Sequence, residues 1–487
     1  MEGTMSESRA KRAARWLLPA IILVYLVLGM LYALYTPAWQ APDEPAHYNY
    51  VQFLAQQSRF PVLKPGDYPA DYLEEIKMAH FPPEMSIAPI RYEFHQPPLY
   101  YILAAPLYRL VGGALWPMRL FSVMMGALLI LVAFWTAQAF VPNRLFLALG
   151  TAAFVAFLPM HLAMTASFNN DILAELLLTM VLLLSLRYLR ASTAPQGEVK
   201  DSHLLVLLGI TTGLGLITKS AVYITLPLGL LAIAARSLWL DEIKPSWRRT
   251  VKDFLLYLLP ALGLAIPWWI RNVALYGGVD FLGLVRHNQV VVGQLRTAEF
   301  VAENGWGRLA GDFAVTTFRS FWGQFGWMGV LLDERLYQAA AILSALALIG
   351  FAVWAFRLWK RCGAYPAWQW AQGGLLLLAG TFAVASYLWY NISFLQHQGR
   401  YLFSALVPIG LAVALGWREV LRRKRAVPLA VALLLLAIIL RLVGWLPTWP
   451  LLMLLAMAMG FGIRRFLPRQ ADPLVHAVPY ALLIILD

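Results

Sequence analysis

The sequence predicts an all-α polytopic membrane protein, and three observations support this fold class. Of the 487 residues, 60% are hydrophobic and only 13% are charged, with a mean hydropathy of +0.63, whereas soluble domains carry about 25% charged residues. Apolar runs close to the length of about 20 residues that spans a bilayer recur along the chain. Basic residues gather between alternate runs. An ordinary soluble enzyme, a disordered protein and a fibrous repeat are excluded, and we expect residues 1–487 to form one transmembrane domain.

We predict about thirteen transmembrane helices from the apolar windows between charged or Pro- and Gly-rich breaks. In chain order the windows are residues 16–35, 116–140, 145–163, 171–190, 203–218, 221–237, 253–270, 337–357, 371–390, 401–417, 427–446, 450–463 and 474–486. The first window is too long for a typical signal-peptide core and no small-x-small cleavage site follows it. We therefore interpret it as a retained span.

The distribution of basic residues predicts a cytoplasmic N-terminus. In that orientation the cytoplasmic segments are short and hold more than half of the 39 Lys and Arg residues, which is the positive-inside pattern. The net charge of +13 is therefore a topology signal, and we expect no nucleic-acid partner. The single cysteine, Cys362, excludes an intramolecular disulfide and a cysteine-cluster metal site.

Two long segments, residues 36–97 and 271–336, fall on the external side in this topology. Acidic residues outnumber basic ones two to one in the first of them, which agrees with the orientation. It leads into residues 98–113, an apolar stretch shorter than a span, for which we expect a helix lying along the outer surface. The second segment is rich in aromatic residues, so we expect it to dip into the membrane interface.

The clearest candidate for chemistry is the motif Pro42-Asp43-Glu44-Pro45-Ala46-His47, directly after the first span. Two adjacent carboxylates at the membrane edge are partly desolvated, which would raise the pKa of at least one and suit it to accept a proton. A solvated acidic turn is the alternative, since acidic residues often flank spans on the outside. Composition alone favours that alternative.

Three further charged residues fall at the outer ends of spans. Asp171 opens the fourth span, Lys219 separates two apolar runs, and Arg271 follows the seventh span. Asp171 also suits an ordinary helix start, where the helix dipole favours a carboxylate. A cation in a tight turn such as that of Lys219 either snorkels to water or neutralises an anion at the lipid boundary.

The segment Gly399-Arg400-Tyr401 leads into the tenth span on the same side. Arg400 offers a fork of donors suited to phosphate, with an interfacial anchor as the equal alternative. Eight scattered histidines without HxxxH or HExxH spacing indicate no dedicated metal motif. Glycine-rich phosphate loops are absent from the sequence, which argues against a cytosolic nucleotide as substrate.

These residues resemble the GT-C class of membrane glycosyltransferases, which includes protein O-mannosyltransferases and the bacterial aminoarabinose transferases that modify lipid A. The resemblance depends on the order and shared sidedness of several short motifs. In chain order they are Pro42 to His47, Gln96-Pro97-Pro98-Leu99-Tyr100-Tyr101, Arg119-Leu120-Phe121-Ser122, Asn170-Asp171, Thr218-Lys219, Arg271-Asn272 with Tyr276-Gly277, and Gly399 to Phe403.

The resemblance implies transfer of a sugar from a polyprenyl-phosphate donor to an acceptor on the external face, with inversion at the anomeric carbon. It assigns the general base to Asp43, with Glu44 supporting it or binding the acceptor. The leaving phosphate needs fixed cations, for which Lys219, Arg271 and Arg400 are the candidates. Further candidates for substrate binding are His47, Arg91, Gln96, Tyr100, Arg119, Asp171 and Tyr401. The class is divided on metals, and without a ligand cluster we expect none, a divalent ion remaining an open alternative.

A transporter or flippase of lipid-linked glycans is the alternative function. Transporters bind substrate near the bilayer midplane on interrupted helices, whereas here the charged residues lie at span ends, which favours the enzyme. The expected partners are the membrane, a polyprenyl-phosphate sugar donor and a lipid, glycan or protein acceptor. Short loops and the lack of an endoplasmic-reticulum retention signal favour a bacterial plasma membrane, with the active site on the external face.

Overall fold

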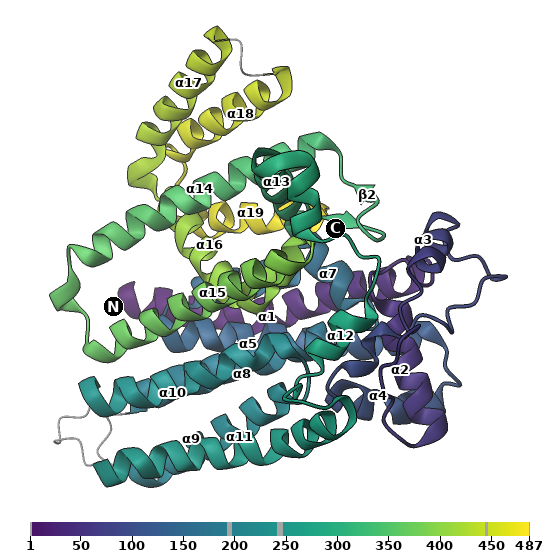
Figure 1. Ribbon diagram of the computed structural model, residues 1–487. Helices are drawn as coiled ribbons and strands as arrows, with labels where there is room; N and C mark the ends of the chain where they lie inside the picture. The colour runs from purple at the N-terminus through teal and green to yellow at the C-terminus, as the bar shows by residue number, and fades with distance from the viewer. Residues whose placement is uncertain (1, 192–196, 241–246, 444–446, 487) are drawn as a thin grey trace.

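The computed structural model describes residues 2–191, 197–240, 247–443 and 447–486, which form a bundle of helices with one short strand pair (Figure 1). The helices that coincide with predicted spans are α1 (Glu2–Tyr35), α5 (Leu115–Phe140), α6 (Leu145–Ala156), α7 (Pro159–Thr165), α8 (Asp171–Ala191), α9 (Gly197–Leu216), α10 (Thr225–Ala235), α11 (Trp247–Tyr276), α14 (Glu334–Trp359), α15 (Ala367–Ser393), α16 (Leu406–Val420), α17 (Ala426–Leu442), α18 (Thr448–Arg464) and α19 (Asp472–Leu486). The predicted all-α class is confirmed.

The remaining elements are short, with one exception. They are the helices α2 (Glu44–Gln57), α3 (Ala70–Met78), α4 (Leu99–Leu110), α12 (Leu284–Val290) and the longer α13 (Thr297–Trp322), the 3-10 helices η1 (Tyr92–His95), η2 (Ser220–Ile224), η4 (Cys362–Ala364), η5 (Gly399–Ala405), η6 (Arg423–Arg425) and η7 (Arg469–Ala471), and the π-helix η3 (Arg236–Leu240). Strands β1 (Gln324–Phe325) and β2 (Val330–Leu331) pair antiparallel.

Nine helices within the described ranges are long and apolar enough to cross a membrane, and α6 and α7 together make a tenth candidate. The predicted span 145–163 is bent by 64° between these two helices, because Pro159 has no N–H and disfavours a helical residue before it. The apolar helices at Asp201–Leu216, Thr448–Arg464 and Asp472–Leu486 are shorter. Thirteen crossings therefore remain a prediction, and the end of the window 427–446 lies outside the described residues.

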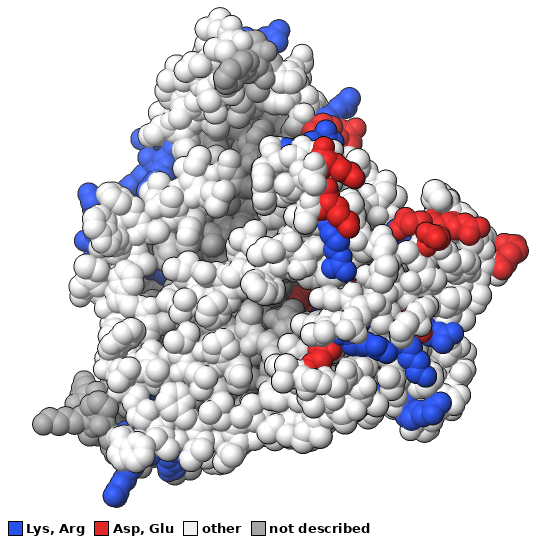
Figure 2. All heavy atoms as spheres, viewed as in Figure 1, with Lys and Arg blue, Asp and Glu red and all other residues white. Residues whose placement is uncertain are grey.

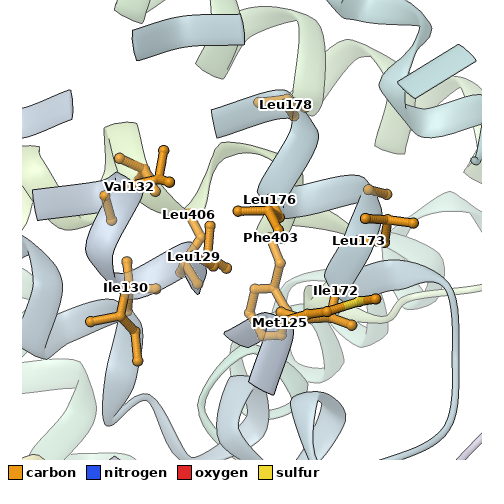
Figure 3. Packing of buried hydrophobic residues seen from close by; sticks show 14 of the residues in the cluster. Met125, Leu129, Ile130, Val132, Ile172, Leu173, Leu176, Leu178, Phe403 and Leu406 are labelled. Carbon is orange, nitrogen blue, oxygen red and sulfur yellow. The ribbon is translucent and has the colours of Figure 1, made fainter. Parts of the chain in front are cut away.

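The core lies where α5 and α8 pack together with η5 and α16. Figure 3 shows Met125 and Leu129 of α5, Ile172 and Leu176 of α8, and Phe403 of η5 in this packing. All five side chains are buried. A helix that is apolar all round, as α5 largely is, belongs inside a bundle. This rigid packing fixes the helix ends that carry the candidate site residues.

Small elements cover the end of the bundle that lies opposite the N-terminus. There α2, α3, α4 and α12 lie together (Figure 1), and α4 supplies the helix expected within residues 98–113. In Figure 2 the acidic side chains visible on this face lie toward that end, whereas the opposite end shows Lys and Arg without visible acidic residues. The visible charges and the arrangement of the helices therefore distinguish the same two ends of the molecule. One end shows only Lys and Arg, and the other, which carries residues 36–97, shows both acidic and basic side chains (Figure 2).

Candidate active site

A cavity of about 1180 Å³ opens at the end of the bundle where α2, α3 and α12 lie. Segments far apart in the sequence form its walls, and we call it the central cavity. Its charged and histidine lining residues are Asp43, His47, Asp71, Glu74, Lys77, Glu93, His95, Asp171, Lys219, His287, Arg308, Asp312, His397 and Arg400. Figure 2 shows a hollow on this face with an acidic side chain inside it.

Asp43 is held by its backbone and by its side chain. It has a left-handed backbone (φ 68°) at the N-cap of α2, a conformation that Asp tolerates better than most L-residues. Its Oδ2 accepts a hydrogen bond from Arg400 Nη2 at 2.5 Å and its Oδ1 one from the Tyr92 hydroxyl at 2.8 Å. Burial acts to raise the pKa of Asp43, but Arg400, His47 and Tyr92 outweigh it and lower this pKa to about 2. The raised pKa expected from desolvation is therefore wrong for Asp43, because its charge is paired.

Arg400 reaches Asp43 through a close packing of η5 against α13. A Cβ on Gly399 would lie 2.3 Å from the carbonyl oxygen of Thr317, so only glycine allows this approach. The Gly399 amide also donates to the Ser320 hydroxyl at 2.7 Å. The Arg400 side chain is 5% exposed and lines the central cavity, so its donors face the cavity in a defined position.

Lys219 and Asp171 form a second ion pair in the central cavity. Lys219 has an extended backbone in the turn before η2, and its Nζ donates to Oδ1 of Asp171, the first residue of α8. Asn170 joins the two segments by donating to the Thr218 carbonyl at 3.1 Å. Burial acts to lower the pKa of Lys219, but Asp171 and Glu93 outweigh it and raise this pKa. The amine is therefore charged at neutral pH.

Glu44 and Arg119 do not line the central cavity. Arg119 of α5 donates to Glu44 through Nε at 2.8 Å and Nη2 at 2.6 Å, and Glu44 also accepts from the Phe168 amide at 3.0 Å. The guanidinium donates in addition to three backbone carbonyls near the end of α1, those of Ala33, Thr36 and Pro37. Both side chains are almost inaccessible. The buried Glu44–Arg119 pair therefore connects α2, α5, the end of α1 and the segment at Phe168, and it lies outside the cavity wall.

Arg271 also lies outside the central cavity. Its Nη2 donates to the Pro61 carbonyl at 2.5 Å, and its guanidinium carbon lies 4.3 Å from the centroid of the Trp268 ring. The structure thus brings two of the three predicted phosphate-binding cations, Lys219 and Arg400, to one cavity and leaves the third outside it.

Of the other predicted substrate-binding residues, some line the central cavity and others do not. His47, Gln96 and Tyr401 line the central cavity. Tyr100 lies in the core, with its hydroxyl 2.7 Å from that of Ser122. Arg91 is exposed and donates through Nε to a nearby backbone carbonyl at 2.6 Å, so neither of these two residues faces the cavity.

Many of the residues that line the central cavity were not among the predicted site residues, and three of them are Tyr92, Glu93 and His287. Tyr92 and Glu93 come from η1, directly before the Gln96-Pro97-Pro98 motif, and His287 comes from α12. The His287 ring centroid lies 4.5 Å from that of His95. Burial lowers the pKa of His95 to about 4 and that of His287 to about 3, so both rings are neutral at pH 7. The only feature of the sequence that could have pointed to Tyr92 and Glu93 as site residues is their position directly before the Gln96-Pro97-Pro98 motif.

The central cavity contains two ion pairs, Asp43 with Arg400 and Asp171 with Lys219. Such a set can accept a proton and can bind a phosphate group. Over the described part of the chain, no group of three or more His, Cys, Asp or Glu side chains is placed to hold a metal ion.

One family of known proteins matches part of the chain. The sequence model of the dolichyl-phosphate-mannose-protein mannosyltransferase family matches residues 50–281, somewhat less than half of the chain. The match includes Lys219 and Asp171 but neither Asp43 nor Arg400. No curated protein is similar enough to count as a match.

Two solved proteins show the same fold. ArnT from Cupriavidus metallidurans bound to undecaprenyl phosphate is 16% identical with a TM-score of 0.54, over 97% of this chain and 76% of that chain. The archaeal oligosaccharyltransferase AglB from Archaeoglobus fulgidus, in complex with an inhibitory peptide and a dolichol-phosphate, is 13% identical with a TM-score of 0.50, over 96% of this chain and 56% of that chain.

The partial family match and the shared fold are both with membrane glycosyltransferases of the GT-C class. Within that class, the family match is to the dolichyl-phosphate-mannose-protein mannosyltransferases. The predicted class is confirmed, and so is the prediction of an enzyme.

Proposed function

We propose that this enzyme transfers a sugar from a polyprenyl-phosphate donor to an acceptor on the external face, with inversion at the anomeric carbon. The observation that supports this proposal most strongly is the presence of Asp43, Lys219 and Arg400 in one cavity. An inverting displacement needs a base on the attacking side and fixed positive charge on the leaving side. The comparison proteins bind undecaprenyl phosphate or dolichol-phosphate, which agrees with such a donor.

In this mechanism Asp43 removes the proton from the acceptor hydroxyl as its oxygen attacks the anomeric carbon. The bond from that carbon to the phosphate oxygen breaks with its electron pair, and the polyprenyl phosphate leaves. Lys219 and Arg400 stabilise the charge that develops on the leaving phosphate, since preorganised donors act most strongly where charge develops.

Both cations are paired with carboxylates before the donor binds, which gives donor binding a second effect. Arg400 donates to Asp43, so a phosphate that attracts Arg400 weakens its hold on Asp43. Losing an opposite charge raises the pKa of a carboxyl group. Donor binding would therefore make Asp43 a better proton acceptor at the moment when it is needed.

Transfer can be tested in proteoliposomes supplied with undecaprenyl phosphate bearing radiolabelled mannose, glucose or galactose, together with a cell-envelope extract as the source of a lipid, glycan or protein acceptor. The expected result is release of undecaprenyl phosphate with one of these sugars. Movement of the intact lipid across the bilayer without release would support the flippase instead.

Lys219→Met should weaken the binding of undecaprenyl phosphate about tenfold or more, because a hydrogen bond to a charged group is lost. Lys64→Met, at an exposed lysine outside the cavity, is the matched control.

The external placement of the active site predicts a labelling pattern in intact cells. Glu84 is exposed in the segment 36–97, and the exposed Cys362 lies in a basic segment after α14. An impermeant maleimide should label Glu84→Cys in a Cys362→Ala background. It should label the wild-type Cys362 only after permeabilisation. The reverse pattern would contradict the proposed orientation.

A further inference from the structure

Glu93 is a buried carboxylate in the wall of the central cavity that the mechanism above does not use. It belongs to η1, whose neighbouring residue Tyr92 donates to Asp43. Its side chain lines the cavity although the residue is only 9% exposed. Its Oε2 is buried and has no hydrogen-bond partner among the described residues.

An unpartnered buried carboxylate oxygen is costly. Leaving a buried acceptor unsatisfied costs about 1–3 kcal/mol, and more for a charged group, so each such atom in a folded protein calls for an explanation. The Glu44 carboxylate shows the ordinary solution, since both of its oxygens accept hydrogen bonds from Arg119 and from backbone amides. Glu93 lacks this arrangement at Oε2 and faces a cavity large enough for a substrate.

The electrostatic surroundings of Glu93 indicate which part of the substrate it meets. Its charged neighbours include Asp43, the proposed base, and Lys219, a proposed phosphate-binding cation. In an inverting displacement the sugar ring lies between the attacking oxygen and the leaving phosphate. Glu93 lines the same cavity as Asp43 and Lys219, so we infer that it lies beside the sugar ring held between them.

We propose that Glu93 accepts a hydrogen bond from a hydroxyl group of the sugar carried by the donor, and so contributes to the selection of that sugar. This inference rests on the proposed function. The terminal torsion of a glutamate is broad, so the carboxylate can rotate to present Oε2 to a bound sugar. Burial, the largest effect, raises the pKa of Glu93, and either protonation state keeps an oxygen able to accept from a hydroxyl group.

The test distinguishes recognition of the sugar from recognition of the lipid phosphate. Affinities of the full-length protein in nanodiscs are measured for undecaprenyl phosphate and for its mannose, glucose and galactose derivatives, and the sugar that the wild type binds most tightly is then used. Glu93→Leu keeps the side-chain size and removes both oxygens. It should weaken binding of the sugar-bearing lipid about tenfold to hundredfold, while affinity for bare undecaprenyl phosphate changes by less than about threefold.

Two further variants make the result specific. Glu93→Gln keeps an acceptor oxygen and should retain most of the sugar preference, whereas Glu75→Leu makes the same change at an exposed glutamate outside the cavity and should alter neither affinity. If Glu93→Leu does not fold, Glu93→Ala removes the same oxygens without added bulk.

Three outcomes would overturn the assignment of Glu93 while leaving sugar transfer intact. They are an unchanged sugar preference in the Leu and Ala variants, an equal loss of affinity for the bare lipid phosphate, and a rise confined to the KM for the acceptor. A wild-type protein that binds none of these lipids would instead overturn the proposed function, and this inference with it.

Discussion

Asp43→Asn should lower the rate of sugar transfer by about 10²- to 10⁴-fold, the range typical of one general acid or base. The change keeps the size of the side chain and its acceptor oxygen, so the Tyr92 hydroxyl retains a partner. It removes the charge that pairs with Arg400. Donor affinity should therefore stay the same or rise, because Arg400 is released for the phosphate.

The measurement is single-turnover transfer in proteoliposomes, together with the affinity for undecaprenyl phosphate. Near-normal turnover in Asp43→Asn would exclude Asp43 as the base. Glu44→Gln is the informative comparison, since Glu44 is the adjacent carboxylate but does not line the cavity. Its effect should come through stability, and loss of turnover in a fully folded Glu44→Gln protein would reverse the roles of the two residues.

Arg119→Met should destabilise the protein by about 3–5 kcal/mol, because it leaves a buried carboxylate without its partner. Glu44 is fully buried, and the same change removes the donor to three carbonyls at the end of α1. The free energy of unfolding can be measured in detergent micelles by denaturant titration. The double variant Arg119→Met/Glu44→Leu should recover part of the loss, since no charge then remains buried.

Arg91→Met provides the control for this prediction. Arg91 is exposed, and exposed substitutions usually change stability by less than about 0.5 kcal/mol. Equal stability of Arg119→Met and Arg91→Met would show that the Glu44–Arg119 pair does not support the fold. A strong loss of activity in Arg119→Met at full stability would instead place Arg119 at the substrate.

The membrane class and the positions of the helices could be predicted because they depend on local sequence. A run of apolar residues must become a helix in lipid, where every backbone polar group needs an internal partner. Each of the thirteen predicted windows overlaps a helix, although the end of the window 427–446 lies outside the described residues. The bend at Pro159 was not predicted, although a proline inside an apolar window is a local signal for one.

Three of the predicted site residues share the central cavity, and each lies where the backbone itself carries it there. Asp43 follows a span, Lys219 lies in a turn between helices, and Arg400 follows an extended stretch. Each position is set by where a helix begins or ends. Sidedness was therefore enough to bring Asp43, Lys219 and Arg400 to the same end of the bundle.

Sequence alone determined the membrane class, the helix windows and the candidate end of the molecule, since apolar length and charge asymmetry are properties of the chain itself. Only the tertiary structure decided which side chains meet. The direction of a side chain depends on the local backbone conformation and, within a helix, on a rotation of about 100° per residue. Asp43, the left-handed N-cap of α2, turns to the cavity, while Glu44, the first residue of the helix, turns to Arg119 in the core. In the same way, Arg271 lies at the end of α11 that the topology predicts, but its side chain packs on Trp268 and does not line the cavity. Rotation about a helix axis depends on packing against distant segments, and no local pattern contains that information.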